Sequence, residues 1–101
     1  MSTPEHRVKA IVNRALAALP RRYSFMPVQN GMGAPGLDYY CCIKGRFVAI
    51  ETKAPGKRPT PRQVRTIMAI ENAGGTVFVV HDKAEVDKMI ALLVLLEEYG
   101  Q

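Results

Sequence analysis

The sequence of 101 residues has no apolar run long enough to cross a membrane. Its longest run, Met89 to Leu96, covers only eight residues, whereas a transmembrane helix needs about 20. The opening residues, MSTPEHRVKA, also lack the apolar stretch of a secretory signal. We therefore expect an intracellular protein with no membrane partner.

Cysteine is scarce, and its two copies, Cys41 and Cys42, are neighbours in the sequence. Adjacent residues of a strand point to opposite faces, so the two thiols are poorly placed to form a disulfide. The sequence has no CxxC motif and no Cys/His cluster, so nothing indicates a zinc site. We expect both cysteines to be reduced packing residues. His6 and His81 have no ligand spacing either, and we expect them to be structural or surface residues.

Length and composition fit a single globular domain over residues 1–101. The hydrophobic fraction of 48% is ordinary for a folded protein and argues against disorder. A domain of this size buries a real core but has little stability to spare.

Charge is unevenly distributed along the chain, whose net charge is +5. Residues 44–65 include seven basic residues and one acid, whereas from residue 71 onward there are six acids and two lysines. A basic middle beside an acidic end is typical of a protein with one face made for a polyanion. The alternative is a solvated surface with uneven charge, and composition alone does not separate the two.

Turn signals and hydrophobic periodicity predict an α/β fold with a small mixed sheet and the order α-β-β-α-β-α. Thr3 and Thr60 are each followed by proline, as at a helix start, and Gln63 completes a capping box. The strands on either side of the second helix should pair in parallel. The expected elements are a helix from Thr3 to Pro20, an extended segment Tyr23–Val28, strands 37–43 and 46–53, a helix from Thr60 to Gly74, a strand 76–81 and a helix 82–98.

The strand expected over residues 46–53 ends on two opposite charges. Glu51 and Lys53 are two residues apart, so their side chains share a face, and an apolar run precedes them. Burying either charge alone would be costly. A structural salt bridge would explain the pair, and so would a site that binds a cation through Glu51 and an anion through Lys53.

The hairpin register brings a second acid to this place. If Lys44-Gly45 is a two-residue loop, Ile43 pairs with Arg46, and counting back places Asp38 opposite Glu51. Side chains directly opposed are about 5 Å apart at Cβ, so two carboxylates there repel unless a cation compensates. Mg²⁺ suits this position, because it is held by one or two carboxylates with water and phosphate oxygens. A three-residue loop with the glycine in a bulge would shift the register.

Two neighbouring features have more than one interpretation. Glycines at 31, 33 and 36 let the backbone before Asp38 approach a ligand closely, but they also fit a plain connection. Tyr39 and Tyr40 could stack on bases, although one of the two should face the core.

In this arrangement the chain resembles the PD-(D/E)xK nucleases, and more closely their VRR-NUC group. The resemblance covers roughly residues 5–81 and implies a restriction-endonuclease-like core. Leu37 is a departure, because the family usually has proline before the aspartate. The motifs that carry the resemblance are Asn30-Gly31, Gly36-Leu37-Asp38, Gly45-Arg46-Phe47, Glu51 to Pro55, Thr60 to Gln63 and Ala73 to Gly75.

The resemblance implies a metal site and catalytic groups. Asp38 and Glu51 would ligate Mg²⁺ or Mn²⁺, and the Thr52 carbonyl would add an oxygen. Glu5 matches a first-helix acid that completes the metal site in many members, although it is equally a plain first-turn acid. Lys53 would orient or activate the attacking water.

The resemblance also implies that Gln63, otherwise a capping-box residue, sits beside the lysine. It implies a structure-selective DNA endonuclease that acts on four-way junctions or flaps; a phage protein in its bacterial host would fit this description. Four basic residues would bind the phosphates of the DNA backbone without recognising the base sequence: Lys57, Arg58, Arg62 and Arg65.

We expect a second copy of the chain among the partners of such a small domain. Branched DNA is better held by a symmetric dimer with two sites, and the last helix is apolar on more than one face. A core helix covered on two sides is the alternative. Two other functions remain open, namely a non-catalytic nucleic-acid-binding module on the same fold and an interaction protein with an incidental Glu51–Lys53 salt bridge.

Overall fold

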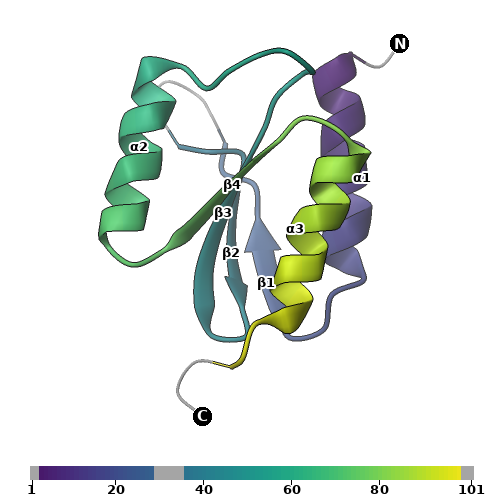
Figure 1. Cartoon of the computed structure of the whole chain (residues 1–101), viewed down its shortest axis with the longest axis vertical. Coiled ribbons are helices and arrows are strands. Elements are labelled where there is room, and N and C mark those ends of the chain that lie inside the picture. The colour runs from purple at the N-terminus through teal and green to yellow at the C-terminus, as the bar shows by residue number, and fades with distance from the viewer. Residues whose placement is uncertain (1–2, 29–35, 99–101) are drawn as a thin grey trace.

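A computed structural model describes residues 3–28 and 36–98 of the chain, and these form three helices and a four-stranded mixed sheet (Figure 1). The predicted α/β class is confirmed. The order has one strand more than predicted, α-β-β-β-α-β-α, because part of the extended segment pairs as a strand. Asn30, Gly31 and Gly33 lie outside the described residues. The elements are α1 Pro4–Ala17, β1 Arg22–Phe25, β2 Tyr39–Ile43, β3 Arg46–Thr52, α2 Pro61–Asn72, β4 Thr76–Val80 and α3 Lys83–Leu95.

The first two helices begin at the predicted caps. Thr3 Oγ1 accepts a hydrogen bond from the His6 amide at 3.1 Å, and Thr60 Oγ1 accepts one from the Gln63 amide at 3.2 Å. Each threonine satisfies a backbone donor that the helix itself leaves unpaired. The caps also fix the first turns in space, and these turns carry Glu5 and Gln63.

The β2–β3 hairpin has the predicted two-residue loop. Ile43 pairs with Arg46, and the ladder continues to Tyr39 opposite Ile50. Lys44 and Gly45 have φ angles of 52° and 79°, the left-handed conformation that this tight turn requires at both positions. The register that places Asp38 across from Glu51 is therefore confirmed.

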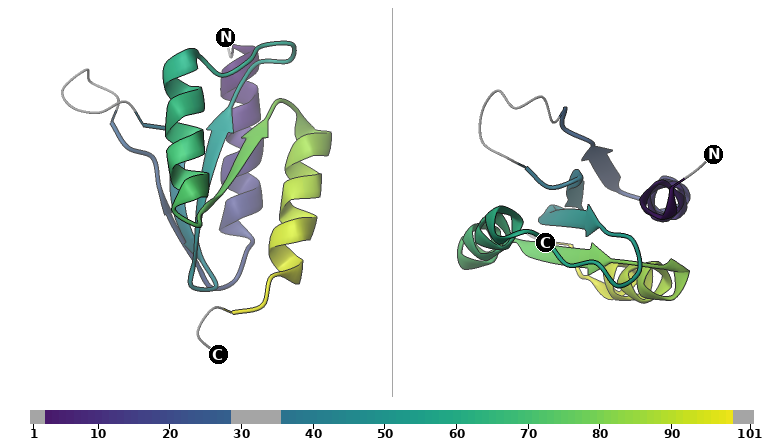
Figure 2. Two further views of the ribbon diagram at one scale, coloured as in Figure 1. Left: turned by 60° about the vertical axis from the view of Figure 1, so that its left-hand side comes forward. Right: turned by 90° about the horizontal axis from the view of Figure 1, so that it is seen from above.

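The sheet has the order β1-β2-β3-β4, with β3 and β4 parallel as predicted and the other pairs antiparallel. Figure 2 shows α1 and α3 on one face of the sheet and α2 on the other. We call these the core face and the open face. Buried apolar side chains of the core face and its helices form one cluster: Val8, Val12, Leu16, Tyr39, Cys41, Ile43, Val48, Ile50, Val80, Val86, Met89 and Leu93.

Strand alternation separates adjacent side chains, as expected for the tyrosines and cysteines of β2. Tyr39 and Cys41 are buried in the core, whereas Tyr40 is half-buried and Cys42 is exposed on the open face. Both cysteines are free. The prediction that Cys42 is a packing residue is wrong, because none of the three described helices covers that part of the open face.

The last helix is shorter than predicted and ends at Leu95. It buries Val86, Met89 and Leu93 and leaves Leu92 and Leu95 exposed. One apolar stripe of α3 therefore packs in the core, and another lies at the surface. Among the described residues there is no helix with the length and apolar character to span a membrane.

Candidate active site

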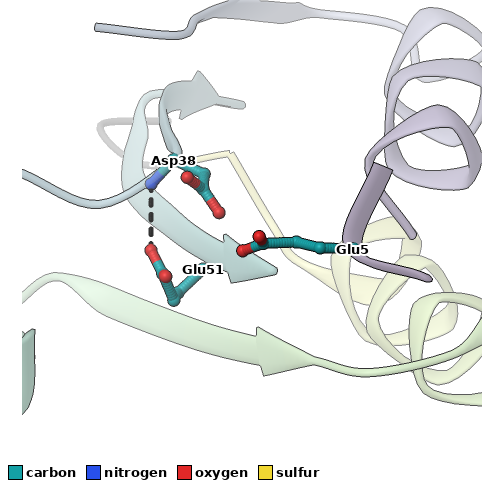
Figure 3. Close-up of side chains that lie close together, drawn as sticks. All are labelled: Glu5, Asp38 and Glu51. Carbon is teal, nitrogen blue, oxygen red and sulfur yellow. Dashed lines mark hydrogen bonds between the residues drawn. The ribbon is translucent and has the colours of Figure 1, made fainter. Parts of the chain in front are cut away.

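Three carboxylates meet at the edge of the sheet where β3 ends. Glu5, Asp38 and Glu51 are the only acids before residue 71, and they come from α1, the residue before β2, and β3. One oxygen from each lies within 4.8 Å of the others (Figure 3). Such a cluster of like charges is unfavourable by itself. Its hard oxygen donors suit Mg²⁺ or Mn²⁺, which would offset the repulsion.

Asp38 is held in place by the end of β3. Its Oδ2 accepts hydrogen bonds from the Thr52 amide at 2.9 Å and the Thr52 hydroxyl at 2.6 Å. Its own amide donates to Glu51 Oε1 at 3.2 Å, the dashed line of Figure 3. The β2 ladder therefore begins at Tyr39 instead of the predicted residue 37, because the Asp38 amide bonds a side chain.

Glu51 is the most buried acid of the cluster, with only 2% of its surface exposed. Burial raises the pKa of its carboxyl above the ordinary 4.5, and the neighbouring Asp38 charge adds to this, while Lys53 opposes it. Lys53 Nζ lies 3.4 Å from Glu51 Oε2. The salt bridge considered from the sequence is thus present, but it leaves the carboxylate short of compensating charge.

Gln63 completes the predicted capping box and also contacts the acid cluster, whereas its implied role beside Lys53 stays a prediction. Its side-chain Oε1 accepts from the Thr60 amide at 2.9 Å, which closes the capping box. Its Nε2 donates to Glu51 Oε2 at 2.9 Å. An amide side chain has a separate acceptor and donor, so one residue can start α2 and orient the buried carboxylate.

Thr52 and Lys53 divide between the two faces at the strand end. Thr52 is fully buried and supports Asp38, whereas the Lys53 side chain is 15% exposed beside Glu51. The Lys53 amide donates to the Val80 carbonyl at 3.0 Å and so anchors the backbone beyond β3. The proposed ligand role of the Thr52 carbonyl stays a prediction.

Lys9 is a member of this cluster that the sequence reasoning missed. Its Nζ lies 3.6 Å from Asp38 Oδ1, and it is one helical turn after Glu5. The Tyr39 hydroxyl lies 2.8 Å from Asn13 Oδ1 and 3.2 Å from the Lys9 carbonyl, which fastens α1 beside the site. Burial raises the pKa of Tyr39 to about 12, so the hydroxyl stays a donor. The i,i+4 spacing of Glu5 and Lys9 was the available signal.

The basic residues of positions 44–65 do not form one face. Lys44 Nζ donates to the Val94 and Leu96 carbonyls at 2.8 and 3.0 Å, and Arg46 Nε donates to the Glu97 carbonyl at 2.9 Å. These two residues thus satisfy carbonyls at the end of α3. Four other basic residues, which we predicted to contact the DNA backbone, are exposed and form no ion pair with any described residue. They are Lys57, Arg58, Arg62 and Arg65.

His81 ties the loop after β3 to the start of α3. Its Nδ1 lies 2.7 Å from Glu85 Oε1, and its Nε2 lies 2.8 Å from the Lys57 carbonyl. The hydrogen bond to Glu85 is the main reason that the pKa of His81 is raised above 6.5. Nδ1 thus fixes the ring to the start of α3, and Nε2 supports the loop that carries Lys57 and Arg58, in line with the structural role expected for this histidine.

The fold and the acid cluster together define a nuclease-like α/β domain. Comparison with family models and with curated protein sequences found no match to the chain. Among solved structures, a chain described as "VRR_NUC domain" is 26% identical, with a TM-score of 0.77, and the match covers 89% of this chain and 97% of that one. This match supports the VRR-NUC family that the motifs indicate, and with it a nuclease-family domain.

Proposed function

We propose that this chain is a single-domain, Mg²⁺- or Mn²⁺-dependent DNA endonuclease that acts inside the cell on branched or otherwise structured DNA, such as four-way junctions or flaps. The observation that carries the proposal is the convergence of Glu5, Asp38 and Glu51 within 4.8 Å, with Lys53 at the edge of the same cluster. These are the only three acids before residue 71, so their convergence concentrates negative charge at one place in an otherwise basic part of the sequence.

The residues fit a divalent cation. Glu5, Asp38 and Glu51 would hold it, together with the Thr52 carbonyl, and a bound ion would supply a Lewis acid that lowers the pKa of its water. The chain keeps these ligands oriented without the ion. Thr52 fixes Asp38 through two hydrogen bonds, and Gln63 fixes Glu51 through one.

Lys53 completes the chemistry of phosphodiester hydrolysis. Its ammonium shares a face with Glu51 and is partly exposed, so it can reach both a water molecule at the carboxylates and a phosphate oxygen. Its charge stabilises the negative charge that develops on the phosphate in the transition state. Gln63 positions Glu51 through the same carboxylate oxygen, Oε2, that Lys53 contacts.

DNA would be gripped next to this site by cations of α2 and the preceding loop. Lys57, Arg58, Arg62 and Arg65 are exposed and unpaired within the described part of the chain. Contacts to phosphates fix position but do not read bases, so we expect strong salt dependence and no sequence preference.

A homodimer would let this small domain hold branched DNA. The exposed stripe of α3, with Leu92 at 53% and Leu95 at 79%, supplies apolar surface for a symmetric contact. In sedimentation experiments the wild-type chain should be a dimer, and Leu95→Glu should shift it towards a monomer. A wild-type monomer at all accessible concentrations would remove this part of the proposal.

Cleavage assays on matched substrates test the function. Linear, flap and four-way DNA are incubated with the protein in Mn²⁺ or in EDTA, beside Lys53→Ala and the control Lys88→Ala on α3. We expect cleavage of branched DNA only with the metal, loss of cleavage in Lys53→Ala, and full activity in Lys88→Ala. Cleavage in EDTA, or full activity of Lys53→Ala, would overturn the mechanism. Metal-insensitive binding without any cleavage would instead show a non-catalytic binding module.

A further inference from the structure

The open face of the sheet carries a row of aromatic side chains that the proposed mechanism does not use. Tyr23 and Phe25 on β1, Tyr40 on β2 and Phe47 on β3 follow one another across three strands, with ring centroids 6.4, 6.0 and 5.8 Å apart. Tyr23 is 67% exposed, and Phe25 and Phe47 are each 49% exposed. We call these four residues the aromatic row.

A groove of about 560 Å³ lies between α2 and two members of the aromatic row, Tyr40 and Phe47. Tyr40 and Phe47 line its sheet side, and Thr66, Ala69 and Ala73 line its helix side. Figure 2 shows that α2 lies over the β3–β4 half of this face and leaves the β1–β2 half uncovered. The rings of Tyr23 and Phe25 on that half are exposed, so accessible aromatic surface continues from the groove.

The floor of the groove depends on Gly75. A Cβ at this position would lie 2.7 Å from Ile70 Cγ2 and 3.1 Å from Phe47 Cδ1. Only glycine lets the end of α2, the Phe47 ring and β4 approach each other this closely.

Both walls of the groove lead to the acid cluster. On the sheet side, Phe47 and Glu51 lie on the same face of β3, and the Tyr40 hydroxyl accepts a hydrogen bond at 3.0 Å from the Leu37 amide, directly before Asp38. On the helix side, Thr66 follows Gln63 by one turn, and Gln63 contacts Glu51. A polymer in the groove would thus extend towards the candidate catalytic residues.

Charge at the rim favours a polyanion over a second protein copy. Arg62 and Arg65 are exposed one turn before Thr66 and Ala69, which line the groove. No acid is among the described residues that line it. A symmetric contact between two copies would oppose these arginines to each other, whereas phosphates would pair with them.

We propose that the groove binds an unpaired nucleic-acid strand, with its bases stacked on the aromatic row and its phosphates facing Arg62 and Arg65. Flat base faces are buried in a duplex and accessible in a single strand, and their stacking on aromatic side chains is tolerant of sequence. This inference rests on the proposed nuclease function and refines its substrate. The single-stranded arm of a branched substrate would occupy the groove and bring the junction with the duplex to the acid cluster.

Cys42 provides a direct probe of the occupied aromatic row, because it lines a small hollow together with all four rings. It pairs with Tyr23 and Phe47 in the two ladders and is exposed among the rings. Cys41, the chain's second cysteine, is buried, and burial raises the pKa of its thiol to about 11. Maleimide labelling of the native protein should therefore report on Cys42, with Cys42→Ala as the control for background reaction.

The labelling experiment is done in EDTA, so that no strand is cut. A saturating oligothymidylate of about 12 nucleotides, within the usual site size, should slow labelling several-fold, and a blunt duplex of equal length should slow it little. Equal labelling with and without bound oligothymidylate would overturn the inference. Protection that appears on raising the protein concentration without DNA would show that a second copy covers this face, and would overturn it as well.

Binding of the same oligothymidylate, followed by fluorescence anisotropy in EDTA, tests the rings themselves. Tyr23→Ala should weaken binding about fivefold or more, whereas Tyr23→Phe and the control Val94→Ala, at an exposed position of α3, should not. Unchanged binding in Tyr23→Ala and Phe25→Ala would contradict the stacking. Both readouts are independent of cleavage. If bound DNA protects Cys42 but the protein never cuts DNA, the proposed function is refuted and the assignment of the groove stands.

Discussion

The two faces of the sheet are built from the same strands but are covered to different extents. The core face is closed by α1 and α3 over a neutral, buried cluster, whereas the open face is only partly covered by α2 and carries the aromatic row, a groove and Glu51. Along β3 the side chains alternate between the two faces, with Ile50 in the core and Glu51 in the acid cluster. Stability is thus concentrated on the core face, which leaves the open face available for unfavourable charge and exposed rings.

The largest effect on stability should come from truncating a buried side chain of the core face. Ile50→Ala should lower the free energy of unfolding by about 2–5 kcal/mol, because Ile50 is fully buried. Tyr23→Ala on the open face should cost less than about 1 kcal/mol. Urea denaturation with constant m-values measures both. Equal losses would show that the open face contributes to folding as much as the core does.

A divalent metal should stabilise the protein through the acid cluster. Mn²⁺ at about one hundred times its dissociation constant should add about 2.7 kcal/mol to the free energy of unfolding. Asp38→Asn should abolish this gain, and Asp87→Asn, which removes an exposed carboxylate of α3, should not. Thermal unfolding in EDTA and in Mn²⁺ decides the matter, and an undiminished gain in Asp38→Asn would rule out this site.

Glu51 should make the open face less stable as pH rises. Its pKa is raised in the folded state, so the folded chain binds more protons than the unfolded chain above the ordinary value of 4.5. In EDTA, the stability of the wild type relative to Glu51→Gln should therefore be highest at acid pH and fall as pH rises through the folded pKa. A relative stability that instead rises with pH would mean that Lys53 outweighs burial.

The smallest effect concerns His81 and the loop of Lys57. The pKa of His81 is raised by Glu85, so its contribution to stability is present below about 6.5 and is lost as pH rises through the folded pKa. His81→Gln should thus cost more at pH 5.5 than at pH 8.5, and by well under about 1 kcal/mol. Denaturation at the two pH values measures this difference, and a cost that grew towards pH 8.5 would refute it.

Local sequence signals predicted the parts of the site that lie close along the chain. The Lys44-Gly45 turn set the register that brings Asp38 to Glu51, and Thr60 with Gln63 located the start of α2. These features depend on short-range backbone geometry, which residue type largely determines.

Features that depend on how elements pack could not be predicted in this way. The contact of Lys9 with Asp38 requires the placement of α1 against the sheet, and the bonds of Lys44 to the end of α3 join residues about half the chain apart. The exposure of Cys42 follows from how little of the open face α2 covers. In each case the residue type allows several environments, and only the tertiary arrangement selects one.

The two hydrogen bonds of the Gln63 side chain have a consequence for when the protein becomes active. The same amide group closes the first turn of α2 and holds the Glu51 carboxylate. A nascent or locally unfolded chain in which this turn has not formed would leave Glu51 misaligned. The proposed cleavage would then begin only once folding is complete, so that an immature molecule poses little danger to the nucleic acid around it.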